Sequence, residues 1–392
     1  MSFFVFNSIN NVLFLWYNDN GDIVFNSAIK ILKMINDKGY EAYIVGGYVR
    51  DVCLSKESKD IDISTNATPK ELSKIFKENA PFDEKYGLTK VFLDKYSFEI
   101  TTYRKDYLYL DNRKPSKIEF VKTIKEDLKR RDFIINTMYM DKNSSIYDLY
   151  NAKKDLKKKI IRTVNNPDIS FKEDSLRILR AIRFATTLNF KLDRKIIKSI
   201  KNNSYLIENL SYTRKKEELE KILSNDNFNY GIKLINKLKL YNYLKIGKIK
   251  KINKTDDILG KWAQIDFDIN YPFTKEEKEK IEKIRKIVSF GKINNDLLYK
   301  YGLNISLTAS EILNLNSDKV LNDYNSLQIK SKDDIKLSIL DISNLLGVKP
   351  SEKVKGIYND LENKIVNNNI KNNKKDIKEF IINSYGGNNN ER

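Results

Sequence analysis

The sequence has no histidine and a single cysteine, Cys53, among its 392 residues. The absence of histidine excludes a histidine general base, a Ser-His triad and a histidine-ligated metal. One cysteine excludes an internal disulfide and a zinc cluster built from cysteines. Chemistry carried out by carboxylates and the metal ions that they bind needs none of these residues.

Long apolar runs are also missing, since none approaches the roughly 18 residues that a membrane-spanning helix needs. The first residues, MSFFVFNSINNVLFLWYN, are apolar but lack a basic start and are interrupted by asparagine, so a signal peptide is not expected. Residues 1–21 are interpreted as an N-terminal extension: an extra strand, a poorly ordered segment or an organelle-targeting remnant. We expect a cytoplasmic protein without a membrane partner; the sequence does not indicate its oligomeric state.

Basic residues dominate the charge: 72 Lys and Arg against 53 Asp and Glu give a net charge of +19. Such a surplus favours a polyanionic partner, although heavy use of lysine, asparagine and isoleucine in an AT-rich genome would give the same balance. Hydrophobic residues make up 41% of the chain, which is long enough for two or three domains.

The most informative stretch is YIVGGYVRDVCLSKESKDID at 43–62. A short strand ends at Gly46 and Gly47, where the missing side chains would let a phosphate approach the backbone, and Arg50 follows to pair with it. The alternative is a plain glycine turn. Asp60 and Asp62 alternate with isoleucines, so a strand would place both carboxylates on one face, either solvated or holding Mg²⁺.

The order GGYVRD, DID and TNA at 46–51, 60–62 and 65–67 resembles the first motif of class II tRNA nucleotidyltransferases (CCA-adding enzymes) and bacterial poly(A) polymerases. The resemblance implies that Asp60 and Asp62 are catalytic and bind two Mg²⁺ ions. It also implies an α+β fold, in which a small mixed β-sheet head precedes an all-α neck, body and tail. Glu99, in the strand FEITTYR, is either a third catalytic carboxylate or faces water.

Two further segments extend the resemblance. RRDFIINT at 130–137 matches a family motif, which implies that Arg131 contacts the nucleotide and that Asp132 and Asn136 lie near its sugar. We expect a helix over 126–141, on which the arginine pair could also be merely solvated. Residues 106–120 are expected to form a mobile loop similar to the family's flexible loop, which is associated with the final adenosine; its core residues are Asp111, Arg113 and Pro115.

Helical spacing over EDSLRILRAIRFA at 173–185 places Arg177, Arg180 and Arg183 on one side. An ordinary amphipathic helix would look the same. Cytosine and adenine both present an amino donor beside a ring-nitrogen acceptor, so an Asp acceptor next to an Arg donor would select them over uracil and guanine. The family's EDxxR motif assigns this base recognition to Asp174 and Arg177, with Arg180 and Arg183 helping to hold the nucleotide.

Several elements are predicted around these motifs. They are helices at 23–38, 68–79, 211–223, 275–286 and 352–366, and a hairpin about Lys95. Asn151 and Ala152 replace the glycine pair usual in the family, which leaves the backbone there undetermined.

The sequence therefore predicts an N-terminal extension (1–21), a catalytic head (22–160), a neck with base-recognition helices (161–245), a helical body (246–340) and a tRNA-binding tail (341–392). The predicted function is addition of C, C and A to the 3′ end of tRNA from CTP and ATP, with protein side chains as the template. The partner would be the tRNA acceptor arm. The alternatives are an A-adding enzyme, a poly(A) polymerase, or a catalytically silent RNA-binding protein.

Overall fold

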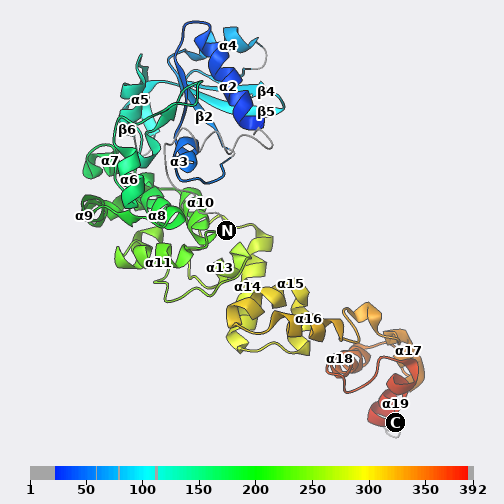
Figure 1. Cartoon of the computed structure of the whole chain (residues 1–392). Helices are drawn as coiled ribbons and strands as arrows, with labels where there is room; N and C mark the ends of the chain where they lie inside the picture. Colours follow the sequence, from blue (N-terminus) through cyan, green and yellow to red (C-terminus); the bar gives the residue numbers. More distant parts are fainter. Residues whose placement is uncertain (1–22, 59, 78–79, 111–113, 387–392) are drawn as a thin grey trace, which may run out of the picture. The chain divides into compact units, whose positions relative to one another are not determined.

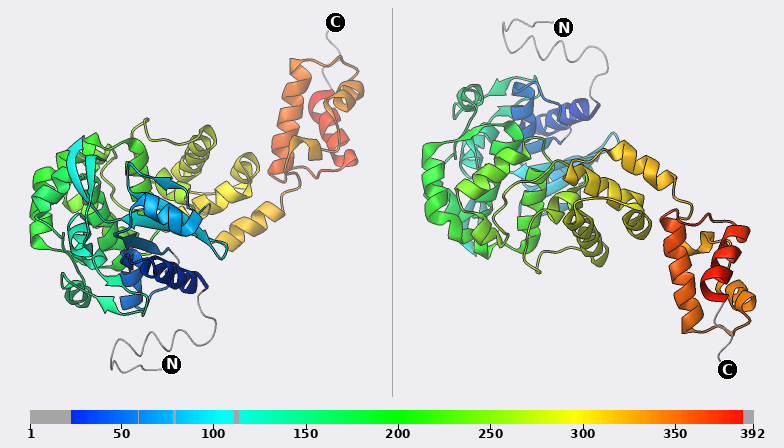
Figure 2. Two further views of the ribbon diagram at one scale, coloured as in Figure 1. Left: turned by 90° about the horizontal axis from the view of Figure 1, so that it is seen from above. Right: turned by 90° about the horizontal axis from the view of Figure 1, so that it is seen from below.

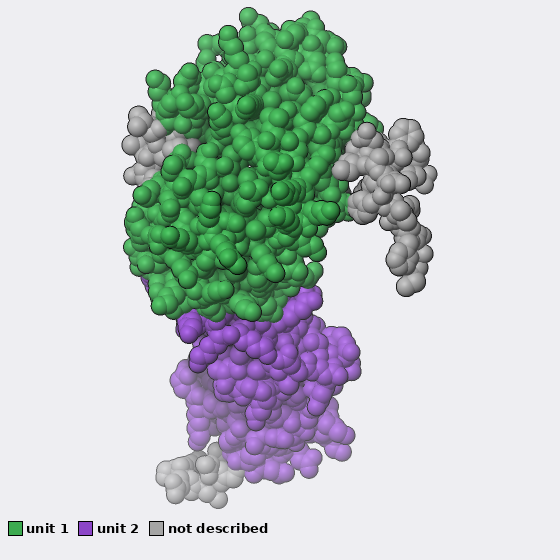
Figure 3. All heavy atoms as spheres, turned by 60° about the vertical axis from the view of Figure 1, so that its left-hand side comes forward, with its two compact units in different colours: residues 1–245 green, residues 246–392 purple. Residues whose placement is uncertain are grey.

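The computed structural model describes residues 23–58, 60–77, 80–110 and 114–386. The chain divides into two compact units, residues 1–245 and 246–392, which are coloured separately in Figure 3. The first unit combines a sheet with helices, and the second is almost entirely helical (Figures 1 and 2). The predicted α+β fold is confirmed. Within the described ranges, no helix has the length and apolar character needed to cross a membrane.

Seven strands form a mixed sheet in the order β3-β4-β5-β2-β1-β8-β9. Strands β2 and β5 run parallel, and the other neighbours are antiparallel. The predicted hairpin is confirmed: Asp94 and Lys95 form its two-residue turn with φ values of 50° and 70°. The strands are β1 (Ala42–Val45), β2 (Asp62–Thr65), β3 (Phe82–Asp83), β4 (Leu88–Leu93), β5 (Tyr96–Thr102), β8 (Tyr139–Met140) and β9 (Ile146–Tyr147).

Three helices of the head are α2 (Ile23–Asn36), α3 (Gly47–Cys53) and α4 (Pro69–Phe76). The first and third begin close to their predicted positions. Helix α4 starts with a capping box, in which the Thr68 hydroxyl accepts from the N–H of Glu71 at 3.4 Å and the Glu71 carboxylate accepts from the N–H of Thr68 at 2.7 Å.

The predicted loop at 106–120 is instead an antiparallel ribbon of β6 (Arg104–Leu110) and β7 (Lys114–Phe120). Aromatic and β-branched residues in the two segments, among them Tyr107, Ile118 and Phe120, favour strands, and the ladder of backbone hydrogen bonds outweighs the polar composition on which the loop prediction relied. Pro115 pairs opposite Tyr109 in this ladder. Asp111 and Arg113 lie outside the described residues.

The single helix predicted over 126–141 is also wrong. Helix α5 (Ile124–Lys129) ends before the motif, which continues as a 3₁₀ turn, η2 (Ile134–Asn136), and then as β8. The Asp132 carboxylate accepts the N–H of Phe133 at 2.8 Å, and the N–H of Ile134 donates to the carbonyl of Arg162 at 2.9 Å. These bonds to a side chain and to a distant segment replace the helical ones.

The rest of the first unit is helical apart from a two-residue ladder of β10 (Ile160–Ile161) and β11 (Lys191–Leu192). Asn151, in place of the family's glycine, adopts a left-handed conformation with φ 60°, which asparagine tolerates better than most residues. The helices are α6 (Ala152–Lys158), α7 (Pro167–Glu173), α8 (Leu176–Leu188), α9 (Arg194–Asn203), η3 (Ser204–Asn209), α10 (Tyr212–Leu223), α11 (Phe228–Lys237) and α12 (Tyr241–Leu244).

The helix predicted over 173–185 is interrupted. Asp174 is extended, with φ −141° and ψ 102°, and separates α7 from α8. Its carboxylate accepts the N–H of Leu176 at 3.0 Å at the start of α8. The predicted helix at 211–223 is confirmed as α10, with Ser211 as its N-cap.

In the second unit, the helices predicted at 275–286 and 352–366 are confirmed as α14 and α18. Gly347, with φ 68°, ends α17. One apolar core of this unit joins α17, α18 and α19 through residues such as Ile342, Leu361 and Ile377, each 0% exposed. The helices are α13 (Ile258–Ala263), α14 (Lys275–Phe290), α15 (Asn295–Leu313), α16 (Ser317–Asn325), η4 (Lys332–Asp334), α17 (Ile339–Leu346), α18 (Glu352–Val366) and α19 (Lys374–Tyr385).

Candidate active site

A cavity of about 890 Å³ opens in the first unit between the sheet and α8. Twelve of its lining residues are ones that the sequence predicts for metal and nucleotide binding. Glu99 does not line it. The predicted residues in the cavity are Gly46, Gly47, Arg50, Asp60, Asp62, Arg131, Asp132, Asn136, Asp174, Arg177, Arg180 and Arg183.

Acidic residues meet at the end of strand β2. Asp60 precedes the strand, Asp62 is its first residue, and Glu99 lies opposite Asp62 in the register of β5. Desolvation of its carboxylate raises the pKa of Asp62 to about 6, with further contributions from the charges of Asp60 and Glu99 and an opposing one from Arg131. A divalent cation would relieve both the desolvation and the repulsion.

Asp60 and Asp62 could supply two ligands to a metal ion but not a complete coordination shell. Among the described residues, no three carboxylate, histidine or cysteine side chains converge closely enough to hold a metal. Two carboxylates fit Mg²⁺, which commonly takes one or two protein carboxylates and completes its shell with water and substrate phosphates.

Gly46 brings the backbone close to this acidic pair. It has φ 78° and precedes α3, and a Cβ there would lie 3.3 Å from Nη1 of Arg131 and 3.8 Å from Oδ2 of Asp62. A side chain at this position would therefore be strained and would enter the space between the two charged groups.

A chain of hydrogen bonds crosses the cavity floor. Arg50 donates through Nε and Nη2 to Asp51 at 2.9 and 2.8 Å, and through Nη1 to Asn136 at 2.8 Å. Asn136 donates to Asp132 at 3.2 Å, and Arg180 donates to Asp132 at 2.7 Å. The floor is thus rigid before any ligand arrives.

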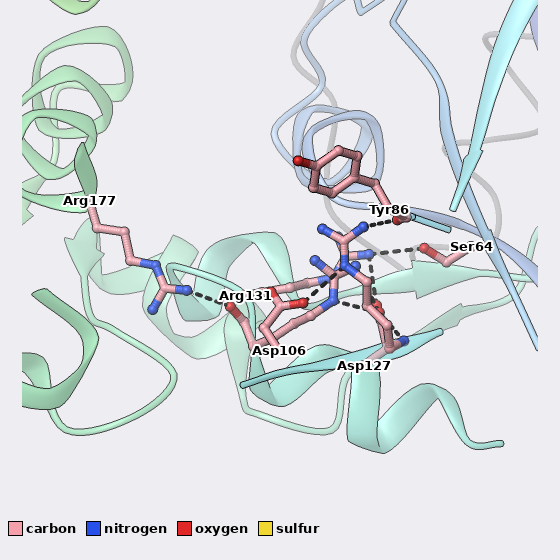
Figure 4. Close-up of polar contacts among 8 residues, drawn as sticks. Ser64, Tyr86, Asp106, Asp127, Arg131 and Arg177 are labelled. Atoms are coloured by element: carbon pink, nitrogen blue, oxygen red, sulfur yellow. Dashed lines mark hydrogen bonds and ion pairs between the residues drawn. The ribbon is translucent and has the colours of Figure 1, made fainter. Parts of the chain in front are cut away.

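Arg177 is fixed from two sides. Its Nη1 donates to the Ser170 hydroxyl and the Glu173 carboxylate, each at 3.0 Å, and its Nη2 donates to the carbonyl of Arg130 at 2.9 Å. Figure 4 shows this guanidinium reaching from α8 toward the turn after α5. The described residues provide no partner for its Nε, so this donor is available to a ligand.

Asp174 lies beside Arg177 in the cavity wall. Burial raises the pKa of the Asp174 carboxyl above its ordinary value, although the charge of Arg177 opposes the shift. One carboxylate oxygen accepts from the backbone of Leu176, which leaves the other as an acceptor facing the cavity. The cavity wall therefore offers an acceptor and a donor side by side.

Comparison with characterised proteins identifies the family. A CCA-adding enzyme of Ligilactobacillus salivarius is 34% identical over 386 residues, which cover 89% of this chain and 94% of that protein. The chain belongs to the CCA-adding enzyme family. It is a nucleotidyltransferase, as the sequence motifs predict.

Other members of the CCA-adding enzyme family agree. The Staphylococcus haemolyticus enzyme is 31% identical over 395 residues, covering 92% of this chain and 98% of that protein. The crystal structure of the Bacillus stearothermophilus CCA-adding enzyme in complex with CTP matches with a TM-score of 0.79 at 25% identity, over 92% of this chain and 97% of that one. The family model of the poly A polymerase head domain matches residues 42–162, and that of tRNA nucleotidyltransferase domain 2 matches 266–381.

Among the lining residues that sequence reasoning missed in this family member are Phe184 and Lys221. The guanidinium carbons of Arg50, Arg180 and Arg183 lie 5.3, 5.4 and 4.6 Å from the ring centre of Phe184. Lys221 reaches the cavity from α10. Phe184 directly follows Arg183 in the sequence, but helical periodicity does not report that a ring lies among the arginines.

Proposed function

We propose that this chain completes the 3′ end of tRNA by adding C, C and A from CTP and ATP. The observation that carries the proposal is the position of Asp174 and Arg177 in the same cavity as Asp60 and Asp62. A base-recognising pair and a cation-binding pair on one cavity are what a protein-templated nucleotidyl transfer requires. The names of the relatives and the CTP complex of the B. stearothermophilus enzyme support the same activity.

Two Mg²⁺ ions would be held by Asp60 and Asp62 together with substrate phosphates. When bound, they would make the tRNA 3′-hydroxyl more acidic and neutralise charge on the leaving pyrophosphate. Arg131, which lines the cavity and whose Nη1 lies beside the Gly46 turn, would donate to the triphosphate. Arg50 contributes positive charge nearby, while its bonds to Asp51 and Asn136 fix its position.

The protein would select the base by hydrogen-bond complementarity. The free oxygen of Asp174 would accept from the amino group of cytosine or adenine, and Nε of Arg177 would donate to the neighbouring ring nitrogen. Uracil and guanine would present a carbonyl to Asp174 and an N–H to Arg177, which are mismatches on both sides. Asp132 and Asn136 would lie near the ribose, and basic residues elsewhere would contact tRNA phosphates.

The direct test uses tRNA transcripts that end before CCA, after C and after CC, with Mg²⁺ and CTP, ATP or both. Stepwise completion followed by arrest supports the proposal. Addition of A alone to the CC-ended tRNA would indicate an A-adding enzyme, long A tails a polymerase, and no extension a silent binding protein.

Two variants assign the roles. Asp60→Asn should abolish transfer while the fold remains intact, with the exposed Asp83→Asn as its matched control. Retained activity in Asp60→Asn would refute the metal assignment. Arg177→Ala should increase misincorporation from UTP or GTP, with the exposed Arg194→Ala as its control. Unchanged selectivity would refute the templating role.

A further inference from the structure

Asp127 is a completely buried carboxylate outside the predicted site residues. It lies on α5, is 0% exposed, and receives hydrogen bonds from two consecutive arginines. Arg130 Nε donates to Oδ1 at 2.8 Å, and Arg131 Nη2 donates to Oδ2 at 3.3 Å. The backbone N–H of Arg104 donates to Oδ1 at 3.3 Å. Figure 4 shows Asp127 at the centre of this network.

The environment keeps this group charged despite its burial. Burial alone would raise the pKa of the Asp127 carboxyl, but the charges of Arg130 and Arg131 outweigh it and hold the pKa below its ordinary value. Removing a carboxylate from water costs several kcal/mol, and an apolar side chain would often fill such a position without loss of stability. The arrangement is therefore better explained by what the carboxylate orients than by stability.

The hydrogen bonds of Asp127 reach residues in different parts of the cavity wall, and the first of them is Arg131. Arg131 Nη2 is shared between Asp127 and the Ser64 hydroxyl, which lies at 3.1 Å on β2. These two acceptors place the guanidinium over the Gly46 turn, with its Nε unpartnered among the described residues. Hydrogen bonds to neighbouring side chains therefore fix the orientation of Arg131 without a ligand.

The contact of Asp127 with Arg130 supports Arg177, one of the two residues proposed to recognise the base. The carbonyl of Arg130 accepts from Nη2 of Arg177, while the Arg130 side chain is bonded to Asp127. The turn between α5 and the 3₁₀ segment is thus attached at both ends. The bond from Arg104 adds the first residue of β6, so the base of the β6–β7 ribbon meets the same carboxylate.

We propose that Asp127 is a positioning residue that, through one buried carboxylate, aims Arg131 at the triphosphate and fixes the turn that supports Arg177. The proposal rests on the function proposed above. It gives Asp127 no contact with the nucleotide, because both of its oxygens are used by the two arginines and by the Arg104 backbone.

The test compares Asp127→Asn with Glu126→Gln, its exposed neighbour on the same helix, which bonds only to Thr123 among the described residues. Asp127→Asn should raise KM for CTP and ATP about tenfold, as expected for loss of a charge-assisted hydrogen bond, with kcat and the KM for tRNA changed less than threefold. If Asp127→Asn does not fold, Asp127→Glu replaces it in the test. This variant keeps the negative charge but shifts the carboxylate, so it should also raise KM for CTP and ATP.

A double-mutant cycle separates positioning from stability. In an Arg131→Ala background, Asp127→Asn should raise KM clearly less than it does in the wild type, because only its effect through Arg130 and Arg177 remains. Full additivity, or equal KM values for Asp127→Asn and Glu126→Gln, would overturn the proposal. Equilibrium CTP binding by the same variants does not require turnover and therefore tests the role of Asp127 independently of activity. If the wild-type chain fails to extend tRNA, the proposed function is refuted, but the binding measurement still decides the role of Asp127.

Discussion

Phe184 should set the spacing of three arginines in the cavity. The ring lies among the guanidinium groups of Arg50, Arg180 and Arg183 at 4.6–5.4 Å and is 8% exposed. Arg50 comes from α3 and the other two from α8, so the ring joins the two sides of the cavity. Replacing it with leucine removes the aromatic face while leaving an apolar side chain of similar size.

The contacts of the Phe184 ring determine how much stability the leucine variant should lose. A partly buried cation–π contact contributes about 0.5–2 kcal/mol, but three neighbouring cations also repel one another, so we expect about 2 kcal/mol in total. The edge-on contact of Phe184 with Phe133, at 5.6 Å between ring centres, adds about 1 kcal/mol. If the three guanidinium groups spread, nucleotide affinity should fall about tenfold or more.

Urea denaturation and KM values for CTP and ATP would measure these two effects. Phe190→Leu is the matched control, because Phe190 is 3% exposed and has no arginine or lysine over its ring among the described contacts. Phe184→Leu should be less stable than Phe190→Leu by about 3 kcal/mol and should alone raise KM. Equal stability and unchanged KM in the two variants would show that the arginines hold their positions without the ring.

Two other predictions concern stability. Burial alone would raise the pKa of Asp132, but the ion pair with Arg180 outweighs it and holds the pKa below its ordinary value. The ion pair therefore stabilises the fold fully at neutral pH, and this stabilisation is lost as pH falls below about 4. In that range the melting temperatures of wild type and Asp132→Asn should approach each other. A constant separation of the two melting temperatures down to pH 3 would contradict this prediction. Asn151→Ala should lower the free energy of unfolding by about 1 kcal/mol, because alanine disfavours a left-handed backbone. Asn151→Gly should keep this free energy within about 0.5 kcal/mol of the wild-type value. Equal losses for the two variants in urea denaturation would show that the positive φ is not the cause.

The parts of the site that could be predicted depend on local chemistry. A glycine pair after an apolar run and a helix over 68–79 each need only neighbouring residues, and the structure has both close to the expected positions. The strand expected to carry Asp60 and Asp62 is shorter, because β2 begins at Asp62 and Asp60 precedes it. The failures have a different origin. The ribbon depends on backbone pairing between β6 and β7, and the turn after α5 depends on the bond from the N–H of Ile134 to the distant carbonyl of Arg162. Periodicity reports neither.

The interrupted helix at Asp174 shows why the missed detail matters for function. On a continuous helix, Asp174 would be one residue of an exposed stripe, and its spacing from Arg177 would be an ordinary i,i+3 pair. The extended backbone at Asp174 instead turns its carboxylate to cap α8, while α7 supplies Ser170 and Glu173 to hold Arg177. The break thus lets one residue face the cavity as an acceptor and lets the preceding helix anchor the donor. Because the N–H of Asp174 donates to the carbonyl of Ser170 at 3.2 Å and Arg177 donates to the Ser170 hydroxyl, a substitution that moves α7 should disturb both side chains together.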